Sequence, residues 1–173
     1  MLSKTMADML LAQVQREWES EFYYLAMMAW CYNNDFEDFG KWFEMQAGEE
    51  RLHGMKMLTY TAEVGNDISI PSVQVPQADF QSIEHIFELT LAHEEKVTGF
   101  INSLVDQALK ENDHRTNAFL QWFVSEQVEE EATVRSLLAK LRRAKGDPSA
   151  LMMIEAKALE TRQSSAGSAP AGE

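Results

Sequence analysis

The sequence predicts an all-α protein: a four-helix bundle with one long crossover loop and a short fifth helix near the C-terminal end. Three observations support this prediction. Only four Pro and eight Gly occur among 173 residues, and they gather near the expected loops and ends. Four long stretches carry an apolar stripe with the period of a helix, and polar side chains interrupt every stripe at its middle. With 45% hydrophobic residues, the chain fits one domain with a substantial core.

Two helices are expected in the first half of the chain, over about residues 3–32 and 36–64. The first stripe consists of Leu10, Val14, Glu17, Glu21, Tyr24 and Met28, and the second of Phe39, Phe43, Gln46, Glu50, His53, Met57, Tyr60 and Val64. Asn33-Asn34 is the expected turn between them. Gly65-Asn66 is a good stop for the second helix, because Gly adopts the left-handed conformation at helix ends.

Two more helices are expected over about residues 80–110 and 114–145. Their stripes consist of Phe87, Leu91, Glu94, Thr98, Ile101, Val105 and Ala108, and of Leu120, Phe123, Gln127, Glu130, Val134, Leu137 and Leu141. The segment 66–79 before them contains Pro71 and Pro76 and has no helical period. Extended, it reaches about 46–50 Å, and a helix of about 30 residues is roughly 45 Å long. It can therefore return the chain along the bundle and make the second and third helices parallel.

A fifth helix is expected from Ser149 to about Arg162, because Asp147-Pro148 combines an N-cap with proline in the first turn. Its apolar side, Leu151, Ile154, Ala158 and Leu159, has no expected place in a completed four-helix core. Residues 164–173, SSAGSAPAGE, are low in complexity and expected to be disordered. The sequence thus predicts one domain over residues 1–163 and a tail over 164–173.

The charge and the cysteine content limit the classes of partner. A formal net charge of −13 and a pI near 4.7 argue against nucleic acid and anionic membranes as partners. The N-terminal residues lack the apolar core of a signal peptide, and no run approaches the roughly 18 apolar residues of a membrane span. The single Cys31 cannot form an intramolecular disulfide and fits a buried packing role. A cytoplasmic location is expected.

Matched spacing brings polar residues of all four stripes to one height. Glu17 and Glu50 are 33 residues apart, as are Glu94 and Gln127, and an expected turn lies near the midpoint of each pair. This level contains four carboxylates, one imidazole and one amide: Glu17, Glu50, His53, Glu94, Gln127 and Glu130. A buried polar group costs roughly 1–3 kcal/mol unless it is satisfied, and an unpaired charge costs more. The arrangement therefore predicts a site for a pair of metal ions.

This set resembles the ferroxidase centre of bacterial-type, haem-free ferritins. Tyr24, two turns after Glu17, and Trp122, just before Gln127, agree with the resemblance, which extends over about residues 1–163. Bacterioferritins and rubrerythrins have a second Glu-x-x-His motif, whereas this chain has Gln127-x-x-Glu130. Leu52 stands where a bacterioferritin offers its haem-ligating methionine, so no haem is expected.

The resemblance implies a role for each residue. Glu17, Glu50 and His53 would bind the first iron, with Glu50 bridging to the second. Glu94 would bind the second iron, with Gln127 or Glu130 beside it. A third iron site is implied at Glu49, Glu126, Glu129 and Glu130, with a solvated acidic face as the alternative.

Three kinds of side chain keep a less defined role. Tyr24 resembles an electron donor near the centre, with a core tyrosine as the alternative. The sequence leaves open whether Glu21 reaches iron or solvent. Surface roles are expected for His85, His93 and His114, which have no carboxylate partners at matched spacing.

The implied function is iron storage. Such a protein binds two Fe(II), oxidises them with O2 or H2O2 as a ferroxidase, and deposits Fe(III) oxyhydroxide inside a hollow shell of 24 identical subunits. The fifth helix is expected to help hold the shell. Two alternatives are a di-iron oxidoreductase of the same fold that stores nothing and a non-catalytic helical interaction protein. Stoichiometric binding of Fe(II) would distinguish the storage protein and the di-iron oxidoreductase from the interaction protein.

Overall fold

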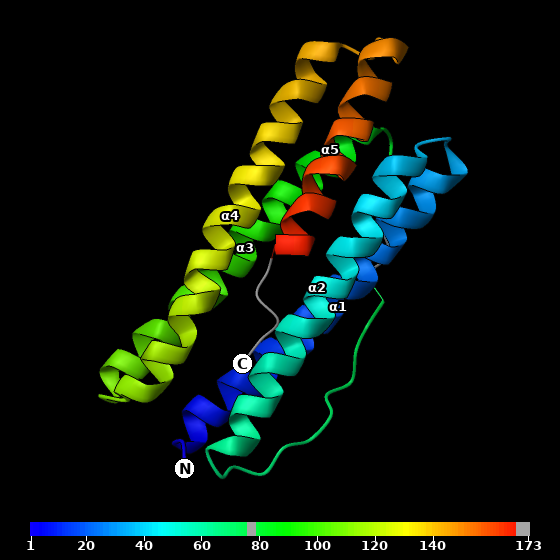
Figure 1. Ribbon diagram of the computed structural model, residues 1–173. Helices are drawn as coiled ribbons and strands as arrows, with labels where there is room; N and C mark the ends of the chain where they lie inside the picture. Colours follow the sequence, from blue (N-terminus) through cyan, green and yellow to red (C-terminus); the bar gives the residue numbers. More distant parts are fainter. Residues whose placement is uncertain (76–78, 169–173) are drawn as a thin grey trace.

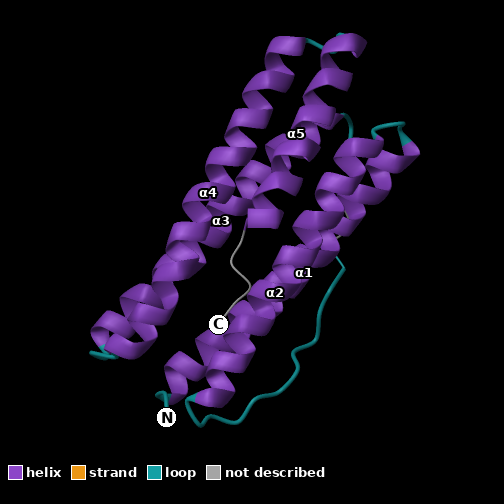
Figure 2. Cartoon of the chain, in the orientation of Figure 1, coloured by secondary structure: helices purple, strands orange, loops and turns teal. Residues whose placement is uncertain are grey.

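The computed structural model describes residues 1–75 and 79–168, and their side chains as far as residue 164. It contains five helices: α1 (Lys4–Asn33), α2 (Glu37–Glu63), α3 (Ile83–Lys110), α4 (His114–Ala144) and α5 (Pro148–Ser168). The described residues include no strand, so the all-α prediction is confirmed (Figure 2). α1 and α2 form one antiparallel hairpin and α3 and α4 another, while α5 packs on α2 and α4 (Figure 1). No helix in this part of the chain has the length and hydropathy that a membrane span requires.

Side-chain caps fix the starts of four helices. Ser3, Ser82, Asp113 and Asp147 each accept a hydrogen bond from the backbone N–H three residues later, at 2.8–3.1 Å. Each bond satisfies one of the N–H groups that a helix start leaves without a partner. Asp147 therefore acts as the N-cap that the sequence predicts for the fifth helix. At the end of α2, Gly65 takes a φ of 86°, a left-handed conformation that Gly adopts without strain.

The long connection between α2 and α3 crosses the length of the bundle. In Figure 1 its described part leaves the lower end of α2 and returns along the bundle toward the start of α3. The second and third helices therefore run parallel, as the length of the segment predicts. Pro71 lies in the described part of this connection, whereas Pro76 lies outside the described residues.

Two apolar clusters fill the bundle on either side of its middle. The first contains buried residues from both hairpins, among them Tyr24, Met27, Cys31, Phe39, Trp42, Phe43, Phe87, Val134 and Leu141. The second lies toward the other end and includes Met6, Leu10, Val14, Met57, Ile101, Leu104, Leu120 and Phe123. In each of the helices α1 to α4, the candidate metal-binding side chains fall between the segments that supply these two clusters. A buried polar layer thus separates two apolar ends.

The fifth helix differs in two respects from the prediction. It continues to Ser168, past the expected end near Arg162, so the first residues of the segment predicted to be disordered are helical. Residues 169–173, the rest of the predicted tail, lie outside the described residues. Its apolar side also has a place in the chain's own core, because Ala158 belongs to the first cluster and Leu151 and Ile154 pack against it. Met152 and Met153 are the large apolar side chains that α5 exposes.

Candidate metal centre

Three side chains from α1 and α2 form a compact group of potential ligands. Glu17, Glu50 and His53 are all buried, and one ligand atom of each lies within 4.8 Å of the others. His53 Nδ1 is 3.5 Å from Glu50 Oε2. Two carboxylates and one imidazole at this spacing can hold one divalent metal ion, and such a mixed oxygen and nitrogen set suits iron.

A close approach of α1 to α2 positions this group. Gly54 follows His53, and a Cβ atom added to it would lie only 2.7 Å from Trp18 Cδ1. Trp18 in turn follows Glu17, so the absence of a side chain at Gly54 lets the two helices meet beside the ligands. On the other side of His53, the ring of Trp122 lies 5.4 Å away between centroids and limits the space around the imidazole.

The opposite hairpin contributes a second group around Glu94. Gln127 Nε2 donates a 3.1 Å hydrogen bond to Glu94 Oε2, and the Tyr24 hydroxyl donates to Glu94 Oε1. Gln127 Nε2 also lies 3.4 Å from the Thr98 hydroxyl. The hydrogen-bond partners of the Glu94 side chain named here are donors, so this carboxylate is held in place by hydrogen bonds that a cation could replace.

Gln46, a residue to which the sequence assigned no role, connects Glu130 to another carboxylate of the layer. Gln46 Nε2 donates a 3.0 Å hydrogen bond to Glu130 Oε2, and its amide also hydrogen-bonds Glu50. Gln46 is fully buried, and its Oε1 atom has no hydrogen-bond partner among the described residues. A buried carbonyl oxygen without a donor is costly, and a cation or a metal-bound water between the carboxylates would satisfy it. The donor set therefore fits a pair of metal ions.

Burial, together with the crowding of the carboxylates, raises the pKa values of the acids in the central layer. Burial, reinforced by the nearby charge of Glu50, raises the pKa of Glu17 from 4.5 to about 8. Burial and the charge of Glu130 raise the pKa of Glu94 to about 7, although the Tyr24 and Gln127 hydrogen bonds oppose the rise. Burial also raises the pKa of Glu50 well above its usual range. At neutral pH the layer therefore holds protons that a divalent cation would displace.

The residues of the implied third site form an outer acidic group on α2 and α4, which we define as Glu49, Glu126, Glu129 and Glu130. Burial raises the pKa values of Glu49 and Glu126, and the charge of Glu130 adds to both shifts. Glu129 is exposed, whereas Glu130 is buried and belongs to the central layer as well. Arg162 from α5 also reaches this group and donates a hydrogen bond to Glu49.

The structure defines the hydrogen-bond partners of two polar residues near the layer, Glu21 and His93. Glu21, which the sequence left open, is buried and accepts a 3.0 Å hydrogen bond from Arg51 Nε, so it is paired within the protein. The surface role expected for His93 is wrong. Its Nε2 lies 2.7 Å from the Ser20 hydroxyl and its ring packs on Tyr24, while burial lowers the pKa of the imidazole to about 4. His114 is exposed, in agreement with the expectation.

Several side chains around the centre escaped the sequence analysis. Gln13 donates a 2.9 Å hydrogen bond to Glu17 from one turn earlier on α1, a spacing that could have revealed it. Gln46 and Thr98 were recognised as stripe residues, but spacing alone did not indicate which carboxylate each one contacts. No sequence signal connects Arg162 to Glu49, because the two residues are 113 positions apart.

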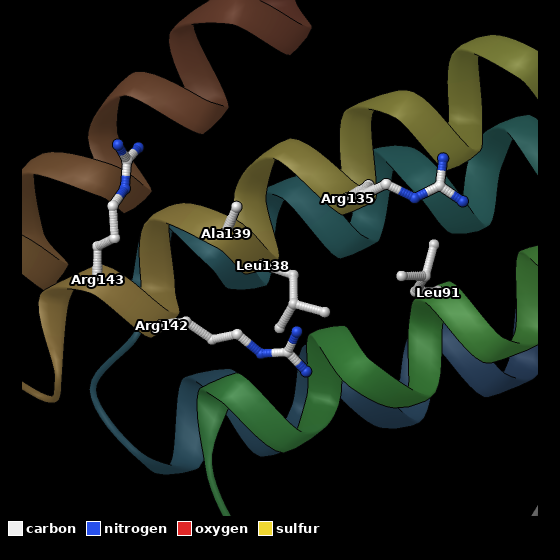
Figure 3. A pocket seen from close by; sticks show the side chains of 6 residues that line it. All are labelled: Leu91, Arg135, Leu138, Ala139, Arg142 and Arg143. Atoms are coloured by element: carbon white, nitrogen blue, oxygen red, sulfur yellow. The ribbon is translucent and has the colours of Figure 1, made fainter.

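A surface hollow between α3 and α4 is separate from the acidic layer. It is lined by Leu91, Arg135, Leu138, Ala139, Arg142 and Arg143 (Figure 3). Arg135 pairs with Glu95 and Glu131, and Arg142 with Glu84 and Glu88. A hollow with three guanidinium groups is unsuited to a metal ion.

Comparison with known proteins agrees with this fold. The profile of the ferritin family, described as a ferritin-like domain, matches residues 7–144. A bacterial non-haem ferritin of Campylobacter jejuni is 38% identical over 142 residues, which are 82% of this chain and 85% of that protein. One from Staphylococcus aureus is 38% identical over 162 residues, 94% of this chain and 97% of that protein. An open-pore ferritin from the archaeon Archaeoglobus fulgidus superposes with a TM-score of 0.89 and 34% identity, over 92% of this chain and 98% of that one.

A helical bundle with a buried layer of carboxylates and one imidazole defines the ferritin-like class of proteins. The chain belongs to the ferritin family, and iron storage with iron oxidation is therefore its general function. The relatives from Campylobacter jejuni and Staphylococcus aureus are bacterial non-haem ferritins, the group that the sequence motifs predict.

Proposed function

We propose that the buried layer is a di-iron ferroxidase centre that oxidises Fe(II) before storage. The observation that carries the proposal is the buried Glu17, Glu50 and His53 group, with ligand atoms within 4.8 Å of one another. Glu50 bridges to a second Fe(II) held by Glu94, with Gln127 or Glu130 beside it. Two irons held side by side can share one molecule of O2 or H2O2, an advantage of proximity that separate sites lack.

The residues of the chain prepare the centre for its substrate. Glu17 and Glu94 release their protons as Fe(II) enters, because the cation stabilises the ionised carboxylates. Gln13 and Gln127 hold the two carboxylates in place, each through an amide hydrogen bond. Tyr24 lies against Glu94, where it can supply an electron, and Fe(III) then leaves for a hydrated oxide mineral inside the shell.

An anaerobic Fe(II) titration followed by a pulse of oxygen tests the proposal. The expected result is tight binding of two Fe(II) per subunit, followed by rapid oxidation of both. Further iron should then be oxidised into a mineral core, which distinguishes a ferritin from a non-storing di-iron oxidoreductase. Failure to bind two Fe(II) per subunit would contradict the proposed centre.

The outer acidic group is expected to govern the later passage of iron. Glu129→Ala should keep the fast first oxidation and change the oxygen consumed per iron and the later turnover, because Glu129 is exposed and lies outside the central layer. Glu130→Ala should have the same effect and also weaken the second iron, because Glu130 belongs to both groups. Iron-to-oxygen ratios at two and at many irons per subunit are the measurement, with the exposed Glu44→Ala as control. Ratios that do not change in either variant would reduce the group to a solvated acidic face.

We further propose that the subunits form a 24-subunit shell in the cytoplasm, with α5 contributing to its contacts. Met152 and Met153 are 68% and 75% exposed on α5, and an exposed apolar pair of this kind suits burial against a neighbouring subunit. Light scattering should show a large particle for the intact protein.

The double substitution Met152→Glu and Met153→Glu should shift the particles to smaller species. The matched pair Thr133→Glu and Ser136→Glu adds the same charge at exposed polar positions of α4 and should not. A monomer or dimer of the intact protein would rule out the shell.

A further inference from the structure

Arg162 brings a cation from α5 to the outer acidic group. Its side chain is only 10% exposed, its Nη2 donates to Glu49 Oε2, and the same nitrogen lies 4.0 Å from Glu130 Oε1. The guanidinium also lies over the ring of Trp42, with Cζ 4.8 Å from the ring centroid. Both carboxylates that Arg162 approaches belong to the implied third iron site.

The guanidinium is incompletely satisfied in this position. Its Nε atom is buried and finds no hydrogen-bond acceptor among the described residues. A guanidinium that is removed from water is stabilised only by carboxylate partners or by contact with an aromatic face. Its attraction to Glu49 and Glu130, together with its contact with Trp42, therefore holds it in place. A divalent cation would compete for the same carboxylate oxygens with twice the charge.

We propose that Arg162 is the resident counter-cation of the outer acidic group and that a third Fe(II) binds there only by displacing it. The inference deepens the proposed ferroxidase function and rests on it. Arg162 neutralises part of the acidic charge before iron arrives, so the third site is weaker than the central pair and fills last. When the third ion enters, the guanidinium leaves Glu49 and the face of Trp42. Arg162 thus acts as a positioning residue that sets the order in which the sites fill.

Calorimetric titration with Zn²⁺, a redox-inert probe, tests this order. Arg162→Gln should bind the third Zn²⁺ at least about tenfold more tightly than the wild type, because the positive charge that competes for Glu49 and Glu130 is removed. The first two ions should bind as in the wild type. Arg162→Lys retains the charge and should preserve most of the weak third binding. Lys157→Gln removes one positive charge from an exposed position of the same helix, where it pairs with Glu160, and should change nothing.

Tryptophan emission supplies a second readout that needs no change at Arg162. The third equivalent of Zn²⁺ should change the emission of the wild type, and Trp42→Phe should remove this change. If the first two ions bind but the third binds equally well to wild type and Arg162→Gln, Arg162 does not compete and the inference is wrong. If Arg162→Gln does not fold, a wild-type emission that stays constant through the third equivalent would overturn it. Absence of the first two binding events would instead overturn the proposed centre.

Discussion

Replacing Glu50 with alanine is expected to abolish the rapid oxidation of the first two irons per subunit, with a loss of at least about 100-fold in rate. Glu50 lies between the ligands of both metal positions: His53 Nδ1 is 3.5 Å away, and the Gln46 amide connects it to Glu130. Its loss should therefore disturb both irons. His53→Ala should chiefly weaken the first iron, and Glu94→Ala the second. Stopped-flow oxidation at two Fe(II) per subunit is the measurement.

Glu44→Ala provides the matched control for this result. Glu44 is on the same helix but is exposed, so its loss removes an equal charge without touching the buried layer. It should oxidise the first two irons at the wild-type rate. If rapid oxidation survived Glu50→Ala unchanged, the ligand set proposed for the centre would have to be abandoned.

The metal-free protein is expected to lose stability as the pH rises from 6.5 to about 8. Glu17 has a pKa of about 8 in the folded protein and 4.5 as a model value, so folding favours its protonated form. The stabilisation from this group is complete below pH 4.5 and disappears as the pH rises through about 8. Between pH 6.5 and 8, the ionisation of Glu17 lowers the free energy of unfolding by about 2 kcal/mol per subunit, at about 1.4 kcal/mol for each pH unit. Glu94, with a pKa of about 7, adds to the loss in the lower part of the window.

The window begins at pH 6.5 because His93 has the opposite effect on stability below that pH. The pKa of His93 is lowered from 6.5 to about 4, so its contribution to stability decreases as the pH falls below 6.5. Thermal unfolding of the metal-free protein at several pH values is the measurement. Glu17→Gln keeps the shape of the side chain and should flatten the dependence, and saturating Zn²⁺ should reverse it. A metal-free protein that became more stable between pH 6.5 and 8 would contradict the buried, protonated layer.

The central layer could be predicted from the sequence because helical periodicity is a local property. Glu17, Glu50, Glu94 and Gln127 each interrupt an apolar stripe, and equal spacing in the two hairpins brings them level. Hydrogen-bond partners were harder to assign, because one residue such as Gln46 can face either of two neighbouring helices. The structure directs its amide toward Glu130 on α4 and Glu50 on its own helix.

What the sequence did not predict concerns residues whose environment depends on tertiary packing. His93 has no carboxylate at matched spacing, yet the arrangement of α1 against α3 brings it to Ser20 and the ring of Tyr24. The contacts of Arg162 depend on the direction that α5 takes after the end of α4. Lys145 and Gly146 both have positive φ values, 51° and 77°, and turn the chain back along α2 and α4. A sequence pattern predicts the helix after this turn but not the face that it covers.

Anomalous diffraction from crystals loaded anaerobically with Fe(II) tests the central claim most directly, because it locates iron without relying on activity. The structure leads us to expect two strong peaks inside each subunit. One should lie among Glu17, Glu50 and His53, and the other beside Glu94 with Gln127 or Glu130. Iron found only at the protein surface, with no peak inside the buried layer, would contradict the di-iron centre.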